Sequence, residues 1–132
     1  MASVLIIDDE PDVSHAIERV MTRAGYQVTV ANTAEEGMDM YTSSPTDIVI
    51  TDIIMPRQHG ISVIKSIRES VPRARIIAIS GGGNFAAQDY QPNAITTTAY
   101  LAAAKKAGAD VVLTKPFDKQ ELLETVTGLL QR

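Results

Sequence analysis

Five short runs of apolar residues, rich in valine and isoleucine, constrain the fold of this chain more than any other feature. The runs are Val4–Ile7, Val28–Val30, Ile48–Ile50, Ile76–Ile79 and Val111–Leu113. Near-continuous apolar runs of this length are typical of strands that are buried on both faces of a sheet. We therefore expect five strands that are buried on both faces.

Segments with the apolar spacing of helices separate these runs. One such segment carries Val13, Ile17 and Met21 on one stripe, and the last carries Leu122, Val126 and Leu129. A regular alternation of strand and helix is typical of a parallel sheet with helices on both faces. The sequence thus predicts an α/β fold, a five-stranded, doubly wound parallel sheet, in a single domain over residues 1–132.

Capping residues and glycines indicate where the expected helices begin and end. Thr33 with Glu36, and Asp118 with Glu121, have the spacing of a capping box at a helix start. Gly25 and Gly108 are expected to follow helix ends. Residues 81–93 are glycine-rich and longer than the usual connection of about 4–6 residues, so we expect a surface loop there and a helix over residues 94–107.

Composition excludes several classes of protein. No apolar run approaches the ~20 residues of a membrane span, and no basic region precedes the first apolar run as it would in a secretory signal. The chain has no cysteine, a net charge of −4 and a pI near 5.1. We expect a cytoplasmic domain without a disulfide framework and without direct binding to nucleic acid, which requires a concentrated basic surface.

Residues with charged or nucleophilic side chains follow or end four of the expected strands. Asp8 and Asp9 follow the first strand, Asp52 the third, Ser80 the fourth and Lys115 the fifth. Functional groups of open parallel sheets gather at this edge. Clustered carboxylates would repel one another unless a cation compensated them, and Mg²⁺ suits a site of few carboxylates that also admits phosphate oxygens. In such a site a carboxylate can attack phosphorus, with Lys115 and Ser80 contacting the incoming oxygens.

Four motifs in this order resemble the receiver domain of bacterial response regulators. The motifs are Asp8-Asp9-Glu10, Asp52-Ile53-Ile54-Met55-Pro56 with Gly60 beyond, Ser80-Gly81, and Lys115-Pro116-Phe117. The resemblance covers essentially the whole chain. It implies a flavodoxin-like fold with strand order 2-1-3-4-5, an order taken from the resemblance alone.

The resemblance also implies roles for individual residues. Asp52 would be the phosphoacceptor, and Asp9 and Asp52 would bind Mg²⁺ directly, with Asp8 acting through water and the backbone carbonyl of Ile54 completing the ligands. Ser80 would be the switch hydroxyl. Lys115 would contact the phosphoryl group and precede a cis peptide bond at Pro116.

Partners follow from the same resemblance. The phosphoryl donor would be a histidine kinase or a histidine phosphotransfer protein, and a downstream effector protein would respond to the phosphorylated form. Receivers catalyse their own phosphorylation and dephosphorylation without being conventional metabolic enzymes. In this chain Val112 stands where the family often has an aromatic switch residue, and His59 stands where Asp or Asn commonly precedes the glycine.

Other functions stay open at this point. A magnesium-dependent phosphohydrolase would use the first aspartate after strand one as nucleophile, but it would want a second aspartate two positions on, where this chain has Glu10. A docking scaffold that is never phosphorylated would not need both Asp52 and Lys115. A flavin or nucleotide binder would need a phosphate-binding loop after the first strand, which is not evident.

Overall fold

The structure is a computed structural model that describes residues 2–53, 60–80, 102–114 and 117–131. Its elements are β1 (Ser3–Ile7), α1 (Pro11–Arg23), β2 (Gln27–Ala31), α2 (Ala34–Ser43), β3 (Ile48–Asp52), α3 (Gly60–Ser70), β4 (Ile76–Ser80), β5 (Val111–Thr114) and α6 (Lys119–Leu130). All five apolar runs lie in strands, so the predicted five-stranded sheet is confirmed.

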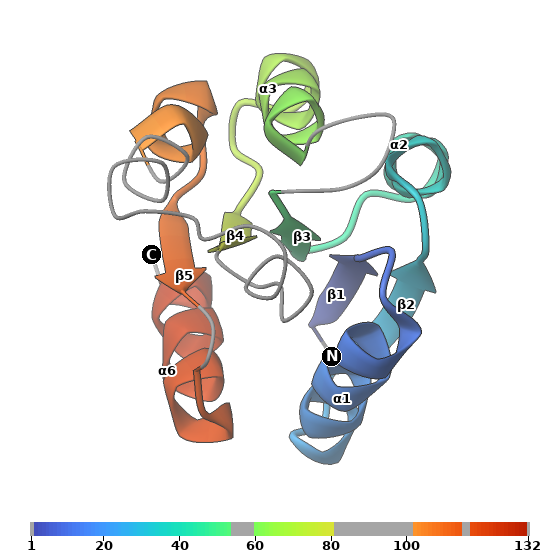
Figure 1. Cartoon of the computed structure of the whole chain (residues 1–132), viewed down its shortest axis with the longest axis vertical. Coiled ribbons are helices and arrows are strands. Elements are labelled where there is room, and N and C mark those ends of the chain that lie inside the picture. Colours follow the sequence, from blue (N-terminus) through green and yellow to red (C-terminus); the bar gives the residue numbers. More distant parts are fainter. Residues whose placement is uncertain (1, 54–59, 81–101, 115–116, 132) are drawn as a thin grey trace, which may run out of the picture.

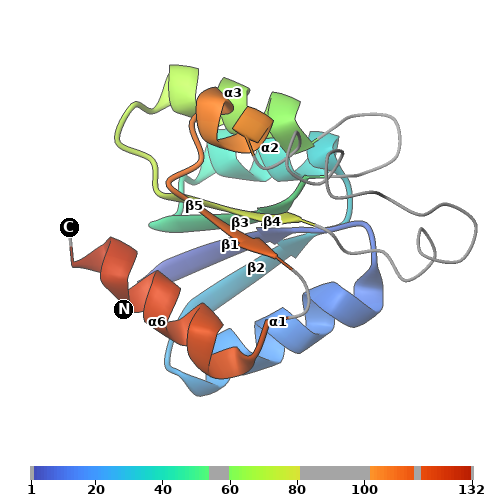
Figure 2. The same cartoon turned by 60° about the vertical axis from the view of Figure 1, so that its left-hand side comes forward.

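The sheet is parallel throughout and has the order β2-β1-β3-β4-β5. This is the doubly wound order expected from the resemblance. The strands lie in one layer between two layers of helices (Figure 1). Figure 2 shows α1 and α6 on one side of the sheet and α2 and α3 on the other.

Each face of the sheet has its own apolar core. Alternate residues of β1 point to opposite faces, so that Leu5 and Ile7 pack toward α2 and α3 while Val4 and Ile6 pack toward α1 and α6. All four side chains are at most 1% exposed. A strand with two buried faces has no position for a solvated side chain, which explains the continuous apolar run.

The outer strand β2 differs from the prediction of two buried faces. Gln27 and Thr29 are exposed, while Val28 and Val30 are half-buried. Since β2 is the first strand in the sheet order, it has only one neighbouring strand. Its run is therefore interrupted by polar residues, as expected for an edge.

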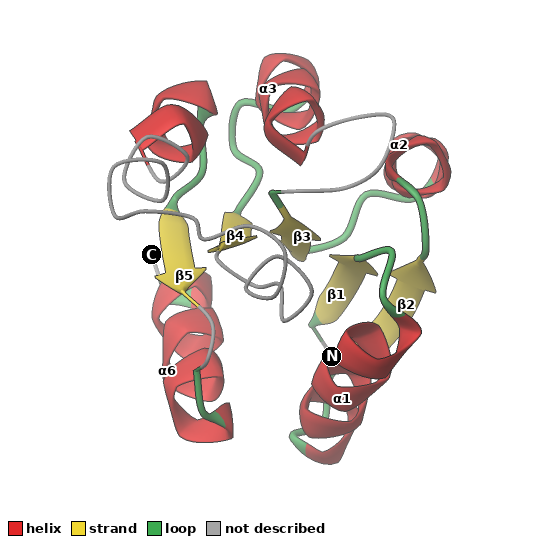
Figure 3. Cartoon of the chain, viewed as in Figure 1, coloured by secondary structure: helices red, strands yellow, loops and turns green. Residues whose placement is uncertain are grey.

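The helix signals in the sequence have the predicted geometry. Thr33 Oγ1 accepts a hydrogen bond of 3.0 Å from the backbone N–H of Glu36, and Asp118 Oδ1 accepts one of 2.7 Å from that of Glu121. Gly25 and Gly108 adopt positive φ angles of 98° and 128°, which glycine tolerates at helix ends. Figure 3 shows these helices alternating with the strands.

The region between β4 and β5 is described only in part. Residues 102–107 are helical, which agrees with the end of the helix predicted over residues 94–107. The loop predicted over residues 81–93 and the first part of that helix lie outside the described residues. In the described part of the chain, no helix is long and apolar enough to cross a membrane.

Arg68 connects the end of α3 to the segment that enters β5. Its guanidinium donates to the carbonyl oxygens of Gly108 and Pro72 and forms an ion pair of 2.8 Å with Asp110. The same Asp110 oxygen accepts a hydrogen bond of 2.8 Å from the backbone N–H of Ile76, the first residue of β4. This Arg68 network therefore joins α3, β4 and β5 at the amino edge of the sheet.

Replacing Arg68 by methionine should lower the free energy of unfolding by about 1–2 kcal/mol. The change removes the donors for two backbone carbonyls and one half of an ion pair whose side chains are 25% and 24% exposed, so that solvent screening limits the loss. Urea unfolding followed by circular dichroism measures it. Lys65→Met, at an exposed position of the same helix, is the control; equal effects of the two variants would contradict a stabilising role for the network.

Candidate functional site

The parallel register brings the carboxyl ends of β1 and β3 side by side. Ile7 of β1 lies level with Thr51 of β3, so the next residues along the two strands, Asp8 and Asp52, reach the same edge of the sheet. Asp8 is 1% exposed and Asp52 is 6% exposed. Two carboxylates are thus held at the edge of a dry core, where a charge is stable only with compensating partners.

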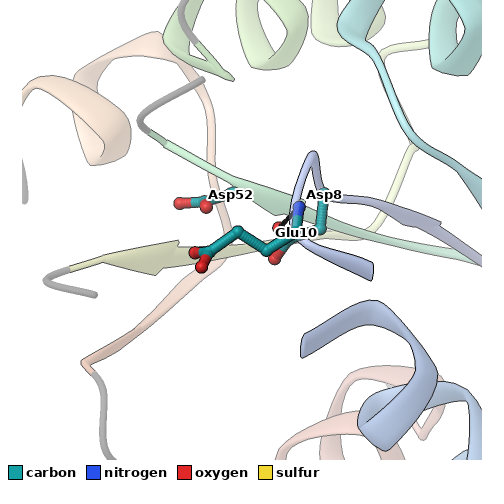
Figure 4. Close-up of side chains that lie close together, drawn as sticks. All are labelled: Asp8, Glu10 and Asp52. Atoms are coloured by element: carbon teal, nitrogen blue, oxygen red, sulfur yellow. Dashed lines mark hydrogen bonds between the residues drawn. The ribbon is translucent and has the colours of Figure 1, made fainter. Parts of the chain in front are cut away.

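A third carboxylate reaches this edge from the turn between β1 and α1. The backbone N–H of Asp8 donates to Ala31 of β2, and the backbone N–H of Glu10 donates to Asp8 Oδ1 at 2.9 Å. Glu10 has an extended backbone and caps the start of α1, where Pro11 occupies the first turn. The resulting tight turn places the Glu10 side chain beside Asp52 (Figure 4).

Asp8, Glu10 and Asp52 form the acidic group of this site. One carboxylate oxygen from each residue can be chosen so that all three lie within 4.8 Å of one another. Like charges at such separations repel, and a cation among them removes the repulsion. The donor set consists of hard oxygen ligands alone, and it therefore fits a hard divalent cation such as Mg²⁺ better than a metal that prefers nitrogen or sulfur.

Two of the three carboxylates predicted as ligands lie in the acidic group. Asp8 and Asp52, both predicted, lie in the group, whereas the predicted Asp9 does not and Glu10 takes part instead. Glu10 belongs to the Asp8-Asp9-Glu10 motif, but the sequence did not predict it as a ligand. A relevant signal in the sequence is Pro11, because a proline disfavours the helical backbone for the residue before it, and Glu10 is extended.

The other predicted site residues are placed only in part. Ser80 is the last residue of β4 and pairs with Thr114, the last residue of β5, at the same edge of the sheet. Lys115 follows Thr114 directly and lies outside the described residues, as does Ile54. Val112 is a half-buried residue of β5 that packs against the core on the side of α2 and α3.

This arrangement defines a doubly wound α/β domain with an acidic group at the carboxyl edge of its sheet. The comparisons with known proteins identify the family. The family model described as the response regulator receiver domain matches residues 4–127. The chain therefore belongs to the response regulator receiver domain family.

Relatives with assigned names agree with this family. The response regulator ArlR of Staphylococcus epidermidis is 30% identical over 132 residues, which are 100% of this chain and 54% of the relative. The response regulator MprA of Mycolicibacterium vanbaalenii is 30% identical over 129 residues, which are 98% of this chain and 50% of the relative. The chain thus spans about half the length of the curated relatives it matches.

Solved structures share the whole architecture. A response regulator receiver domain protein from Clostridium thermocellum has a TM-score of 0.84 and 27% identity, and the match covers 100% of this chain and 96% of that one. A putative response regulator from Chloroflexus aurantiacus has a TM-score of 0.82 and 28% identity, with 99% and 98% coverage. The flavodoxin-like receiver fold predicted from the sequence is confirmed.

Charge-removing substitutions should reveal which carboxylates bind the cation. We expect Glu10→Gln and Asp8→Asn each to weaken Mg²⁺ binding by about tenfold or more, because each removes a hard anionic oxygen from the acidic group. Isothermal titration with MgCl₂ measures the dissociation constant. Glu35→Gln, at an exposed position of α2, is the matched control.

Asp9→Asn separates the two ligand sets. If Asp9→Asn abolished binding while Glu10→Gln left the dissociation constant unchanged, the ligand set implied by the family resemblance would hold and the acidic group seen here would not be the ligand set.

Proposed function

We propose that this receiver domain accepts a phosphoryl group on Asp52 from a phosphohistidine of a histidine kinase or histidine phosphotransfer protein. The observation that supports the proposal is the position of Asp52: its carboxylate is 6% exposed, ends a central strand and belongs to the acidic group. The location expected for a domain with such a partner is the cytoplasm.

The transfer needs a nucleophile, and it needs the repulsion between that carboxylate and the negatively charged phosphoryl group to be reduced. A carboxylate oxygen of Asp52 forms the new bond to phosphorus, and the bond between phosphorus and the imidazole nitrogen of the donor breaks, its electron pair returning to that nitrogen. Asp8 and Glu10 add negative charge around this oxygen, which opposes the approach of a phosphoryl group. A divalent cation among these carboxylates would lower this electrostatic barrier to the approach of the donor.

Mg²⁺ is the cation that we propose for this site. When bound, it would neutralise charge on the phosphoryl oxygens and on the carboxylates that hold it. Asp8, Glu10 and Asp52 would hold it from the described part of the chain, with Asp9 and the carbonyl of Ile54 as further ligands implied by the family. Ser80 and Lys115 would contact the phosphoryl oxygens, as their places at the ends of β4 and β5 suggest.

Signalling after phosphorylation is part of the same proposal. A phosphoryl group adds charge and hydrogen-bond acceptors at the edge where β3, β4 and β5 end, and it can thereby reorder nearby segments. An effector protein would recognise the altered surface. Because the named relatives are about twice as long as this chain, the effector and the output of the whole protein also belong to the proposal.

Replacing the acceptor tests the proposal directly. After incubation with Mg²⁺ and acetyl phosphate, the wild-type chain should gain the mass of one phosphoryl group, and Asp52→Asn should gain none because an amide is a poor nucleophile. Intact-mass spectrometry measures the gain. Asp39→Asn, at an exposed position of α2, should be labelled like the wild type. Persistent labelling of Asp52→Asn would show that another residue is the acceptor.

A hydrolase with Asp8 as nucleophile makes a different prediction. It would release phosphate repeatedly from phosphomonoesters, and Asp52→Asn would keep a covalent intermediate on Asp8. We expect no more than one phosphoryl group per chain and no turnover of p-nitrophenyl phosphate. Sustained turnover that Asp8→Asn abolishes would favour the hydrolase.

A further inference from the structure

The first residue of α3 packs directly on the backbone of the proposed acceptor. Gly60 is buried, and its backbone N–H donates a hydrogen bond of 2.7 Å to the carbonyl oxygen of Ile53. A methyl group added at Gly60 would lie 2.8 Å from the carbonyl carbon of Asp52 and 2.9 Å from Cα of Ile53, and it would overlap the carbonyl oxygen of Asp52. These atoms are backbone, so they cannot move aside as the end of a flexible side chain could.

The peptide group between Asp52 and Ile53 is also held from two other directions. Thr51 Oγ1 donates a hydrogen bond of 3.1 Å to the carbonyl oxygen of Asp52, and Thr51 is fully buried. The backbone N–H of Ile53 donates to the carbonyl oxygen of Ile79 in β4 at 3.0 Å. The backbone that carries the Asp52 carboxylate is thus fixed by α3, by its own strand and by the neighbouring strand.

We propose that Gly60 and Thr51 are positioning residues, which set the location of the Asp52 carboxylate relative to Asp8 and Glu10. This inference rests on the proposed function of Asp52 as acceptor. Neither residue touches the phosphoryl group in this scheme. They act through the peptide group that follows the acceptor, and a shift of that group moves the nucleophile and one member of the acidic group together.

The geometry of such a site decides its rate. In-line attack requires the nucleophile within about 0.5 Å of its productive position, and a misplacement of 1 Å can cost about a hundredfold in rate. An added Cβ at Gly60 must push the first turn of α3 and the end of β3 apart. This displacement moves the Asp52 carboxylate, so we expect the rate of phosphoryl transfer and the affinity for Mg²⁺ to fall by more than the loss of stability alone would cause.

Four variants of the full chain test the inference. Gly60→Ala introduces the steric conflict, Thr51→Val removes the hydroxyl at similar volume, and Thr51→Ser retains it. Val126→Ala is the control for general destabilisation, because Val126 is a fully buried residue of α6 on the opposite face of the sheet from α3. Urea unfolding ranks the stability of all four.

The decisive measurements are the rate of labelling by acetyl phosphate at saturating Mg²⁺ and the dissociation constant of Mg²⁺ itself. We expect labelling to slow by about tenfold or more in Gly60→Ala and by about threefold in Thr51→Val, and to stay within about twofold of wild type in Thr51→Ser and Val126→Ala. Mg²⁺ binding should weaken in the first two variants only. Rates that fall in proportion to the loss of stability, with Val126→Ala slowed as much as Gly60→Ala, would overturn the inference.

If Gly60→Ala does not fold, the Thr51 pair decides, and equal labelling rates in Thr51→Val and Thr51→Ser overturn the inference. If the wild-type chain is not labelled, the proposed function fails, while the Mg²⁺ titrations still decide whether the two residues position Asp52. Unchanged affinity in Gly60→Ala and Thr51→Val would then overturn the inference.

Discussion

The parallel pairing of β1 with β3 is the constraint on which the rest of the site depends. It fixes Ile7 level with Thr51 and so brings the carboxylates of Asp8 and Asp52 to one edge of the sheet. Repulsion between them would drive the strand ends apart if only surface contacts opposed it. The opposing contribution comes from side chains such as Val4, Ile6 and Ile50, which lie at most 1% exposed between two layers of helices.

A buried core that opposes an unfavourable site is a common arrangement in functional proteins. Here the residues of the core and those of the site are neighbours along the chain, because the charged residues come at the end of an apolar strand or directly after it. The sheet supplies rigidity where the carboxylates need fixed positions, and the turns beyond its edge supply the remaining groups. A cation that binds the folded chain at that edge and not the unfolded chain would stabilise the fold, which couples occupancy of the site to the stability of the whole domain.

The fold and two of the three members of the acidic group, Asp8 and Asp52, could be predicted from the sequence because they depend on strands that are buried on two faces. The run Ile48–Ile50 predicts β3, and the end of that strand predicts the location of Asp52. The presence of Glu10 in the acidic group could not be predicted from the burial of strands, and Asp9 as a ligand stays a prediction. The placement of Glu10 depends on the backbone conformation of the short turn between β1 and α1, and adjacent carboxylates in a turn have no periodicity that would tell which one faces the strand edge.

The close approach of Gly60 to Asp52 could not be predicted from the sequence either, although both residues belong to one motif. A glycine eight positions after an aspartate has many possible reasons, among them a turn or a positive φ angle. Only the packing of α3 on β3 shows that the missing side chain leaves room for a backbone carbonyl. Sequence patterns report burial and periodicity well, and they report contacts between backbone segments poorly.

The polar residues of β2 have a consequence for how this domain behaves among copies of itself. An outer strand presents one row of backbone N–H and C=O groups that no strand of its own sheet pairs, and an apolar outer strand invites another chain to extend the sheet. Gln27 and Thr29 are exposed polar residues of this outer strand, and the strand is only five residues long. The polar residues and the short length of β2 are therefore features that disfavour extension of the sheet at this edge, which is one of its two outer edges.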